Sequence, residues 1–502
     1  MKRLFTLIVS ATAALSAMAT DYTDSLLVLV NGEGTGQRAT ITVTEHDGLY
    51  DLNLKNFILM NGNSPVPVGN VELTGIVPER SGDAIFLRTT QDIQVTEGDL
   101  AGVAFWMGPM LGSLPVEVTA VLEDGGLRAL INLDLMAQMQ QVVEVRFGKS
   151  LIAGKGYHIP NGDFEAWHAS ADNFVEPNAW HSFESASGAL APLAGHHIEK
   201  SAEGRNGSSC ARIFATSIFG IVANGTMTTG RMNAGAFSAD DKQNNAYLDM
   251  SKEDVDGNGD PFYVSLNSRP DSLTFWVRFR QGTVNSDHPY ATVSAVITDG
   301  TYYQDPEDKA YTNVVARAAN RQIATTGDAW QRISVPFVYE EGSVEPKAIL
   351  VTISTNADAG QGSDGDEVFV DDLTLVYNSR LSELNVGGFS PDKFEYDVEG
   401  TLSLDDIVAV ADSRDAYVLK RIVDTEDGQQ AVVTVYSADL RSHTDYTLKF
   451  DGAASAVALS MHPANATTYY TLGGQHVATP TPGHVYVVRQ SDGQSKVKVI
   501  KK

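Results

Sequence analysis

The stretch ATITVTEHDGLYDLNL, residues 39–54, indicates the fold class of this chain. Apolar and polar residues alternate over 39–44 and again over 49–54, which is the period-two pattern of strands that bury one face. The link between the two runs contains Asp47-Gly48, a pair that favours a tight hairpin turn because both residues tolerate positive φ angles. The stretch therefore predicts two antiparallel strands joined by a short turn.

Further strand-like runs continue this pattern as far as residue 147. Turn-forming residues such as Asp124-Gly125-Gly126 separate them, as expected for antiparallel connections. About eight short strands at this spacing predict a closed barrel or a sandwich, and a barrel of that size can be filled by side chains or hold one small ligand. The runs lie at 71–76, 85–88, 116–122, 127–133 and 142–147.

Several short motifs occur in order within residues 20–150. In this order they resemble the calycin-like (lipocalin-like) β-barrel domains of exported bacterial proteins, which implies a barrel that binds a small ligand or a partner. The motifs are VNG at 30–32, DGLY at 47–50, LKNF at 54–57, PVGNV at 67–71 and VRFG at 145–148.

A second set of motifs spans residues 157–378. It comprises PNGDFEAW at 160–167, NSRPDSLTFWVRF at 267–279 and DEVFVDDLTL at 366–375. These motifs resemble the family named "putative carbohydrate metabolism domain" and, more broadly, the jelly-roll β-sandwiches of carbohydrate-binding modules. The resemblance implies an all-β central domain that recognises glycans.

The C-terminal part divides into three further segments. Residues 379–452, with LSELNV at 381–386 and YTLKF at 446–450, resemble the small cadherin-like β-sandwiches of bacterial surface proteins. Residues 453–467 are rich in Ala, Ser and Asn and are interpreted as a linker. Residues 468–502 end in the basic KVKVIKK and resemble the C-terminal sorting domain of type IX secretion substrates. A simple β-hairpin that closes the preceding sandwich is the alternative for this tail.

The N-terminus has the features of a signal peptide, residues 1–19. Lys2 and Arg3 precede an apolar run over 4–15, and Ala17-Met18-Ala19 fits the cleavage rule. The run is too short to span a membrane, so no transmembrane segment is expected. No cysteine ends the run, which excludes lipid attachment at this site. We therefore expect a secreted protein or one displayed at the outer-membrane surface.

The chain is strongly acidic, with a formal net charge of -27 at pH 7. Such a chain repels nucleic-acid phosphates and anionic membrane surfaces, so neither is an expected partner. The single cysteine, Cys210, lies in an alternating run and is predicted to be a small buried apolar side chain. The oligomeric state is not indicated by the sequence.

One acidic loop fits the needs of calcium, which prefers several hard oxygens around a tight turn. Gly259 stands at the sixth loop position, where the turn is sharpest. Ser265 replaces the bidentate Glu of an EF-hand and a strand follows, so the loop is not an EF-hand. A polar surface turn is the alternative. The candidate ligands are Asp254, Asp256, Asn258 and Asp260.

Glu165, Asp371 and Asp372 form a second carboxylate group. In the jelly-roll modules that this segment resembles, the first and last strands lie side by side, which implies a structural calcium ion held by these residues. A hydrogen-bonded polar seam is the alternative. Catalysis of glycoside hydrolysis by such a pair ranks below both, because a seam between strands is not a cleft. Structural calcium is thus the cofactor that the sequence suggests, and no catalytic residue is assigned.

Aromatic side chains are the expected platform for a sugar ring. Tyr302 and Tyr303 follow a strand and are predicted to be exposed in a loop. Trp180 lies near another loop and is the third candidate, with packing at a strand edge as its alternative. Trp276 and Trp330 are expected in the core.

These observations favour a secreted or surface-attached binding protein, with a jelly-roll domain for glycan recognition and accessory β-domains. A carbohydrate-active hydrolase that uses jelly-roll carboxylates is one alternative. A structural or adhesive envelope protein without a sugar ligand is the other.

Overall fold

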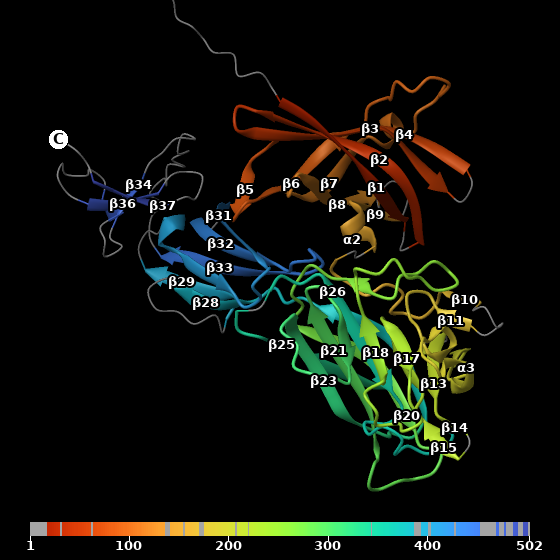
Figure 1. Cartoon of the computed structure of the whole chain (residues 1–502). Helices are drawn as coiled ribbons and strands as arrows, with labels where there is room; N and C mark the ends of the chain where they lie inside the picture. Colours follow the sequence, from red (N-terminus) through yellow and green to blue (C-terminus); the bar gives the residue numbers. More distant parts are fainter. Residues whose placement is uncertain are drawn as a thin grey trace, which may run out of the picture.

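The computed structural model describes residues 18–451 with short gaps, together with four strands of the C-terminal tail. The described chain is almost entirely β-structure, which confirms the predicted fold class (Figure 1). Residues 1–17 of the predicted signal peptide and the whole predicted linker lie outside the described residues. The gaps are at 31–32, 62–63, 136–140, 154–155, 170–174, 206–207, 219, 343, 386–392, 400–402 and 426–427.

Nine strands of the N-terminal region form one antiparallel sheet, in the order β4-β3-β2-β1-β9-β8-β7-β6-β5. The strands are β1 (Met18–Val30), β2 (Glu33–His46), β3 (Leu49–Asn61), β4 (Ser64–Ile76), β5 (Pro78–Ser81), β6 (Ala84–Gln94), β7 (Ser113–Glu123), β8 (Gly126–Leu135) and β9 (Gln141–Phe147).

This sheet curls into a half-barrel (Figure 1). Asn70 of β4 and Thr96, just beyond β6, exchange two backbone hydrogen bonds of 2.9 and 3.2 Å, so the two sides of the sheet approach each other. The hairpin predicted from residues 39–54 is confirmed, with Ile41 of β2 opposite Leu54 of β3. Both side chains belong to the buried apolar cluster inside the curl.

The central region is a sandwich of two antiparallel sheets. A five-stranded sheet has the order β12-β13-β27-β20-β24, and a six-stranded sheet has the order β16-β26-β21-β23-β25, with β19 also paired to β26. Phe275 and Phe279 of β20 share one core with Val293 of β21 and Ile353 of β26, so this core lies between the two sheets.

The five-stranded sheet comprises β12 (Ile198–Ser201), β13 (Cys210–Phe214), β20 (Ser272–Arg280), β24 (Gln331–Pro336) and β27 (Glu367–Val376). The six-stranded sheet comprises β16 (Thr226–Thr228), β19 (Val264–Ser265), β21 (Tyr290–Thr298), β23 (Val314–Ala324), β25 (Val338–Tyr339) and β26 (Ala348–Ser354). The buried Cys210 confirms the prediction for this side chain, and burial raises the pKa of its thiol to about 12.

A third layer covers part of the outer face of the six-stranded sheet. It consists of β17 (Arg231–Ala234), β18 (Asn244–Leu248) and β22 (Tyr303–Asp305), in the order β17-β18-β22. Leu248 of this layer packs with Val296 and Leu350 of the six-stranded sheet in a second core. Strand β26 is therefore apolar on both faces, because both faces are covered.

Short hairpins and helices complete the described chain. Two hairpins are formed by β10 (Trp167–Ala169) with β11 (Val175–Pro177) and by β14 (Thr216–Ile218) with β15 (Ile221–Ala223). The helical elements are η1 (Gly108–Leu111), α2 (Lys149–Ala153), η2 (Phe183–Ser185), α3 (Ala191–Ala194) and η4 (Leu404–Asp406). Within the described residues, no helix has the length and apolar character needed to cross a membrane.

The C-terminal region contains a small two-sheet domain and a separate tail sheet. The small domain pairs β28 with β30 and orders its second sheet β29-β33-β32-β31, around a core that includes Leu384 and Val433. Its strands are β28 (Leu381–Asn385), β29 (Glu395–Glu399), β30 (Val408–Ala411), β31 (Tyr417–Thr425), β32 (Gly428–Tyr436) and β33 (His443–Asp451). The tail sheet contains β34 (Thr468–Tyr470), β35 (His476–Val477), β36 (Val485–Arg489) and β37 (Ser495–Val499).

Candidate ligand-binding site

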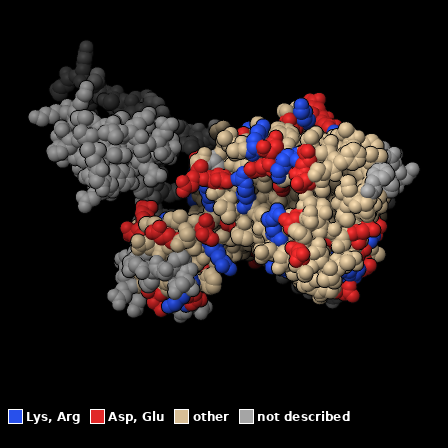
Figure 2. Space-filling view, turned by 60° about the horizontal axis from the view of Figure 1, so that its bottom comes forward, with Lys and Arg blue, Asp and Glu red and all other residues tan. Residues whose placement is uncertain are grey.

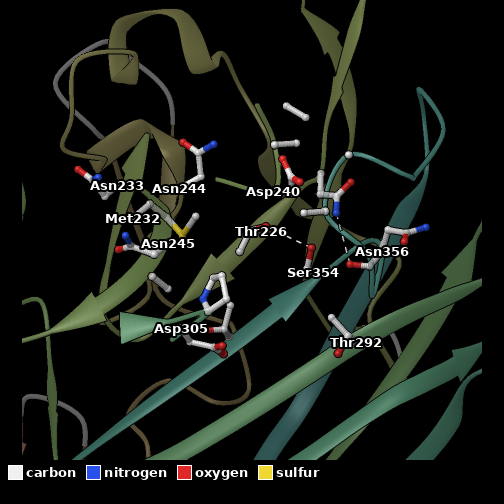
Figure 3. Close-up of a pocket in the computed structure, with 18 of the residues that line it drawn as sticks. Thr226, Met232, Asn233, Asp240, Asn244, Asn245, Thr292, Asp305, Ser354 and Asn356 are labelled. Atoms are coloured by element: carbon white, nitrogen blue, oxygen red, sulfur yellow. Dashed lines mark hydrogen bonds between the residues drawn. The ribbon is translucent and has the colours of Figure 1, made fainter. Parts of the chain in front are cut away.

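A cavity of about 780 Å³ opens on the central sandwich, on the outer face of the six-stranded sheet beside the third layer (Figure 3). This volume lies within the roughly 300–1,000 Å³ typical of small-ligand sites. Strands β16, β21, β23 and β26 form its floor, and β17, β18 and β22 form one wall. Helix α3 and the β14–β15 hairpin contribute the remaining sides.

The floor of the cavity carries hydroxyl groups on neighbouring strands. Thr292 and Ser294 of β21 lie opposite Ser354 and Thr352 of β26, and Thr226 of β16 also pairs with Ser354. Strand residues two apart face the same side, so the apolar residues between them face the sandwich core while the hydroxyls face the cavity. Thr226 Oγ1 donates to Ser354 Oγ at 3.2 Å, as the dashed line in Figure 3 shows.

Asparagine side chains flank this floor on two sides (Figure 3). Asn245 donates through its Nδ2 to the carbonyl of Lys242, and Asn224 donates to the carbonyls of Asn356 and Asp358. The Oδ1 atoms of Asn224 and Asn245 are buried and accept no hydrogen bond from the described part of the chain. Both residues line the cavity, but these two oxygens have almost no exposed surface, so a ligand would reach them only after a side-chain rotation.

The apolar side of the cavity is unusually exposed. Leu193 of α3, Ile221 of β15 and Phe237 line it and are 47%, 43% and 64% exposed. Large apolar side chains in such positions mark interaction sites when they gather around a pocket. The cavity is thus amphipathic, with a polar floor and an apolar rim.

Acidic groups also line the cavity. Asp305, at the end of β22, is partly buried, and burial raises the pKa of its carboxyl although the hydroxyl of Ser294 acts in the opposite direction. Glu307 accepts hydrogen bonds from Tyr303 at 3.1 Å and from Arg317 at 2.6 Å. Asp240 stands at the rim. A carboxyl with a raised pKa in a cavity is a candidate proton donor.

The three predicted aromatic ligands lie in different environments. Tyr303 lines the cavity but is 2% exposed. Tyr302 is 39% exposed, packs against Tyr247 with ring centroids 5.7 Å apart, and is not among the lining residues. Trp180 is fully buried, packs against Phe164 and donates through its Nε1 to the carbonyl of Pro160, so its ring lies in the core and offers no face to a ligand.

Trp276 and Trp330 were expected in the core, and the structure corrects this expectation. Both rings are partly exposed: Trp276 of β20 points away from the core that its neighbours Phe275 and Val277 enter, and Trp330 directly precedes β24. The guanidinium of Arg205 lies 4.3 Å from the Trp276 ring centroid, and that of Arg278 lies 5.2 Å from the Trp330 centroid.

Glu165, Asp371 and Asp372 all contact residues of the segment 205–209. Glu165 Oε1 accepts from the amide of Ser209 at 2.7 Å, and Asp371 Oδ2 accepts from the amide of Arg205 at 2.7 Å. Asp372 accepts from Arg205 Nε at 2.8 Å. Protein donors thus satisfy these oxygens, which matches the polar-seam alternative, and calcium here stays a prediction.

The four ligands predicted in the loop at 254–260 point in different directions. Asp254 pairs with Arg231, whereas Asp260 Oδ2 accepts from the amide of Ala179 at 2.8 Å and from Asn258 Nδ2 at 3.2 Å. Asp256 Oδ1 accepts from the amides of Asn258 and Asp260 at 2.8 and 2.9 Å, the pattern of an Asx-stabilised turn. A calcium ion in this loop stays a prediction.

The cavity itself was not found by sequence reasoning. Thr292, Ser294 and Ser354 look like ordinary polar positions of alternating strands, and only the pairing of distant strands brings them together. The sequence around Phe237 contains no motif that predicts a binding residue.

One known protein family matches the N-terminal domain. The family model of the calycin-like beta-barrel domain matches residues 18–149, which confirms the predicted calycin-like domain. The jelly-roll family name, the cadherin-like module and the sorting domain stay predictions. No curated protein matches the chain.

Three solved structures show weak overall similarity. A "putative glycoside hydrolase" from Bacteroides thetaiotaomicron is 13% identical, with 70% of this chain and 84% of that chain covered and a TM-score of 0.31. The M60 catalytic domain with the CBM51-1 and CBM51-2 domains of Clostridium perfringens ZmpB is 11% identical, with 97% and 44% covered and a TM-score of 0.16. The Cry4Aa toxin of Bacillus thuringiensis is 9% identical, with 72% and 53% covered and a TM-score of 0.19. TM-scores this low carry no argument about this chain.

Proposed function

We propose that this chain is an exported binding protein whose central sandwich holds a neutral glycan in the cavity beside the third layer. One observation carries the proposal: side chains with hydroxyl and amide groups line one side of the cavity, and exposed apolar side chains including Phe237 lie on another. A pyranose matches this arrangement, because its hydroxyls lie around the ring edge while its C–H groups form apolar faces.

The charges around the cavity favour a neutral ligand over an anion. Arg317 is engaged by Glu307 and Glu340, and Arg321 contacts Asp358 at 3.1 Å, so both guanidinium groups already have carboxylate partners. On the face in Figure 2, acidic and basic side chains alternate and no continuous basic area is visible. Lys242 also lines the cavity, but the carboxylates of Asp240, Asp305, Glu307 and Asp358 outnumber the cations there, which disfavours a phosphate or nucleic-acid ligand.

A glycoside hydrolase is the second candidate. Asp305 supports it, because a carboxyl whose pKa is raised by burial suits a general acid. A second carboxylate would be required about 5–10 Å away, and Asp240 at the rim is the residue to test for that role. The half-barrel and the small C-terminal domain serve as partner or spacer modules in either case.

The test is a glycan array followed by titration calorimetry on the full mature chain. Phe237→Ala should weaken binding by about tenfold or more, since stacking and apolar burial at such a contact contribute on the order of 1.5 kcal/mol. Phe105→Ala is the matched control, because Phe105 is 59% exposed and lies in the N-terminal domain.

Three outcomes separate the alternatives. If the protein bound no glycan on the array, the proposal would be rejected and the structural or adhesive role would remain. Loss of binding in Phe105→Ala alone would place the ligand on the N-terminal domain instead. Release of reducing sugar that disappears in Asp305→Asn would establish the hydrolase.

A further inference from the structure

Three side chains outside the ligand cavity, those of His168, Glu176 and Asp256, meet at one buried point, and His181 lies beside Asp256. His168 of β10 and Glu176 of β11 are direct cross-strand partners in the short hairpin, so their side chains leave the same face. His181 follows a few residues later and is held by two backbone hydrogen bonds with Thr228, both 2.8 Å. Asp256 arrives from the turn at 254–260, about 75 residues further along the chain by its numbering.

The atoms that face each other are close. His168 Nε2 lies 3.1 Å from Asp256 Oδ2, and His181 Nδ1 lies 3.5 Å from the same oxygen. One ligand atom each of His168, Glu176 and Asp256 lies within 4.8 Å of the other two. The side chains of His181 and Asp256 are 0% exposed and that of His168 is 9% exposed, while Glu176 is fully buried as a residue.

None of the facing atoms makes a hydrogen bond within the described part of the chain. This holds for His168 Nε2, His181 Nδ1, Asp256 Oδ2 and the second carboxylate oxygen of Glu176, Oε2. His168 Nε2 and Asp256 Oδ2 are thus as close as hydrogen-bonded atoms, at 3.1 Å, but their relative orientation does not allow a hydrogen bond. Buried polar atoms are seldom left this way, and four at one point require an explanation.

The opposite atoms of three of these side chains are fully engaged. His168 Nδ1 lies 3.0 Å from Asn178 Oδ1, which makes Nδ1 the protonated nitrogen and leaves a lone pair on Nε2. Glu176 Oε1 accepts from the amide of Ser182 at 2.7 Å and from the Ser185 hydroxyl at 3.0 Å. Asp256 Oδ1 accepts from two amides of its own turn. Outer partners of this kind orient the ligands of metal sites.

We infer that His168 Nε2, His181 Nδ1, Asp256 Oδ2 and Glu176 Oε2 bind a divalent transition-metal ion, with Zn²⁺ the best match. Imidazole nitrogens favour Zn²⁺, Ni²⁺ or Cu²⁺ over Ca²⁺ and Mg²⁺, which prefer oxygens alone. Ligand atoms at ordinary Zn–N and Zn–O distances around a tetrahedral ion lie about 3.3–3.5 Å apart. The two separations of 3.1 and 3.5 Å fit this geometry.

The site is structural in character. With His181 as the fourth ligand beside His168, Glu176 and Asp256, the tetrahedral shell would be filled, whereas a catalytic zinc ion keeps one position open. None of the four residues lines the ligand cavity. The ion would add to the contacts that already join the β10–β11 hairpin, the segment at His181 and the turn at 254–260, such as the hydrogen bond from the Ala179 amide to Asp260 Oδ2. A two-carboxylate, two-imidazole set also balances the charge of the ion.

The test uses the full mature chain after treatment with a chelator. Zn²⁺ added at about 100-fold its Kd should raise the melting temperature of the central domain by about 5–10 °C, since an ion that binds only the folded state stabilises it. Co²⁺ should give the visible absorption bands of a four-coordinate site, and elemental analysis should find a single ion per chain.

Two variants and one control decide the assignment. Asp256→Asn keeps the Oδ1 acceptor that holds the turn, and His168→Gln keeps much of the side-chain volume, so each should fold yet lose the Zn²⁺ shift. His46→Gln, a partly exposed histidine of β2, should retain it. The inference would be overturned if Zn²⁺ did not raise the melting temperature of the wild type, or if it raised that of both variants by the same amount. Stabilisation by Ca²⁺ but not Zn²⁺ would also overturn it. Should the variants fail to fold, the Co²⁺ spectrum and metal content of the wild type still decide.

Discussion

The imidazole Nε2 of His158 lies 2.9 Å from Oδ2 of Asp439, and this pair joins the start of the central region to the small C-terminal domain. The side chains are 10% and 8% exposed. Asp439 Oδ1 also accepts from the Ser437 hydroxyl at 2.7 Å and from the Arg441 amide at 3.2 Å. The two regions thus share a buried, hydrogen-bonded polar contact and not only a covalent connection.

Removal of either partner should destabilise the chain, because the remaining group would stay buried without its partner. We expect Asp439→Ala to lower the free energy of unfolding by about 3 kcal/mol. Glu395→Ala is the control, since its pair with Lys449 is exposed and should contribute less than about 1 kcal/mol. Urea titrations of both variants measure the difference, and equal effects would contradict a special role for the buried pair.

The lowered pKa of Asp439 leads us to expect a loss of stability in acid. Burial acts to raise the pKa of Asp439, but hydrogen bonds from His158 and Ser437 outweigh it and hold the pKa below its ordinary value of 3.8. A depressed pKa stabilises the folded state above pH 3.8, and this contribution disappears as the pH falls through the folded-state pKa. The difference in unfolding free energy between wild type and Asp439→Asn should therefore become smaller as the pH falls through the folded-state pKa of Asp439. A constant difference would count against the assignment.

For Asp305 in the ligand cavity we expect the opposite dependence of stability on pH, because its pKa is raised. Burial raises its pKa, so the unfolded chain ionises this group at a lower pH than the folded chain does. Stability is consequently lost as the pH rises from 3.8 to the raised pKa. Asp305→Asn should be more stable than the wild type at pH 7 and lose this advantage in acid, whereas the exposed Asp287→Asn should change little at either pH. Thermal melts across the range would show the trend, and an Asp305→Asn variant that is less stable at pH 7 would refute it.

Local pattern was sufficient to identify strands and turns. The alternation around Ile41 and Leu54 identifies strands, and Asp47-Gly48 identifies their turn, because each signal acts within a few residues. The same logic failed for Trp180, whose neighbourhood resembles a loop although its ring packs on Phe164 in the core.

The sites could not be obtained in this way, because they depend on register between distant strands. Ser294 and Ser354 become neighbours of the cavity only through the pairing of β21 with β26. His168 and Asp256 have no characteristic spacing, and the acidic turn looked like a calcium loop because its Asx hydrogen bonds use the same residue types. Composition therefore singled out this turn but not the atom, Asp256 Oδ2, that faces the histidines.

The last prediction concerns strand β6, which is buried on both faces. Leu87 enters the core of the half-barrel, whereas the adjacent Phe86 points the other way and packs on Tyr417 of the small domain, with ring centroids 5.0 Å apart. Tyr417 is fixed in turn by an accepted hydrogen bond from Arg128 at 2.8 Å and a donated one to Glu123 at 2.7 Å. Phe86 is thus an anchor between the two domains.

Phe86→Ala should therefore cost about 3–5 kcal/mol, chiefly by releasing the small domain from the half-barrel. Leu87→Ala is the matched control, with a cost of about 2–5 kcal/mol confined to the half-barrel core. In small-angle X-ray scattering the radius of gyration should grow for Phe86→Ala and stay unchanged for Leu87→Ala, because only the former opens a contact between domains. An unchanged radius in both variants would mean that the Arg128 and Glu123 hydrogen bonds of Tyr417 hold the interface without the aromatic contact.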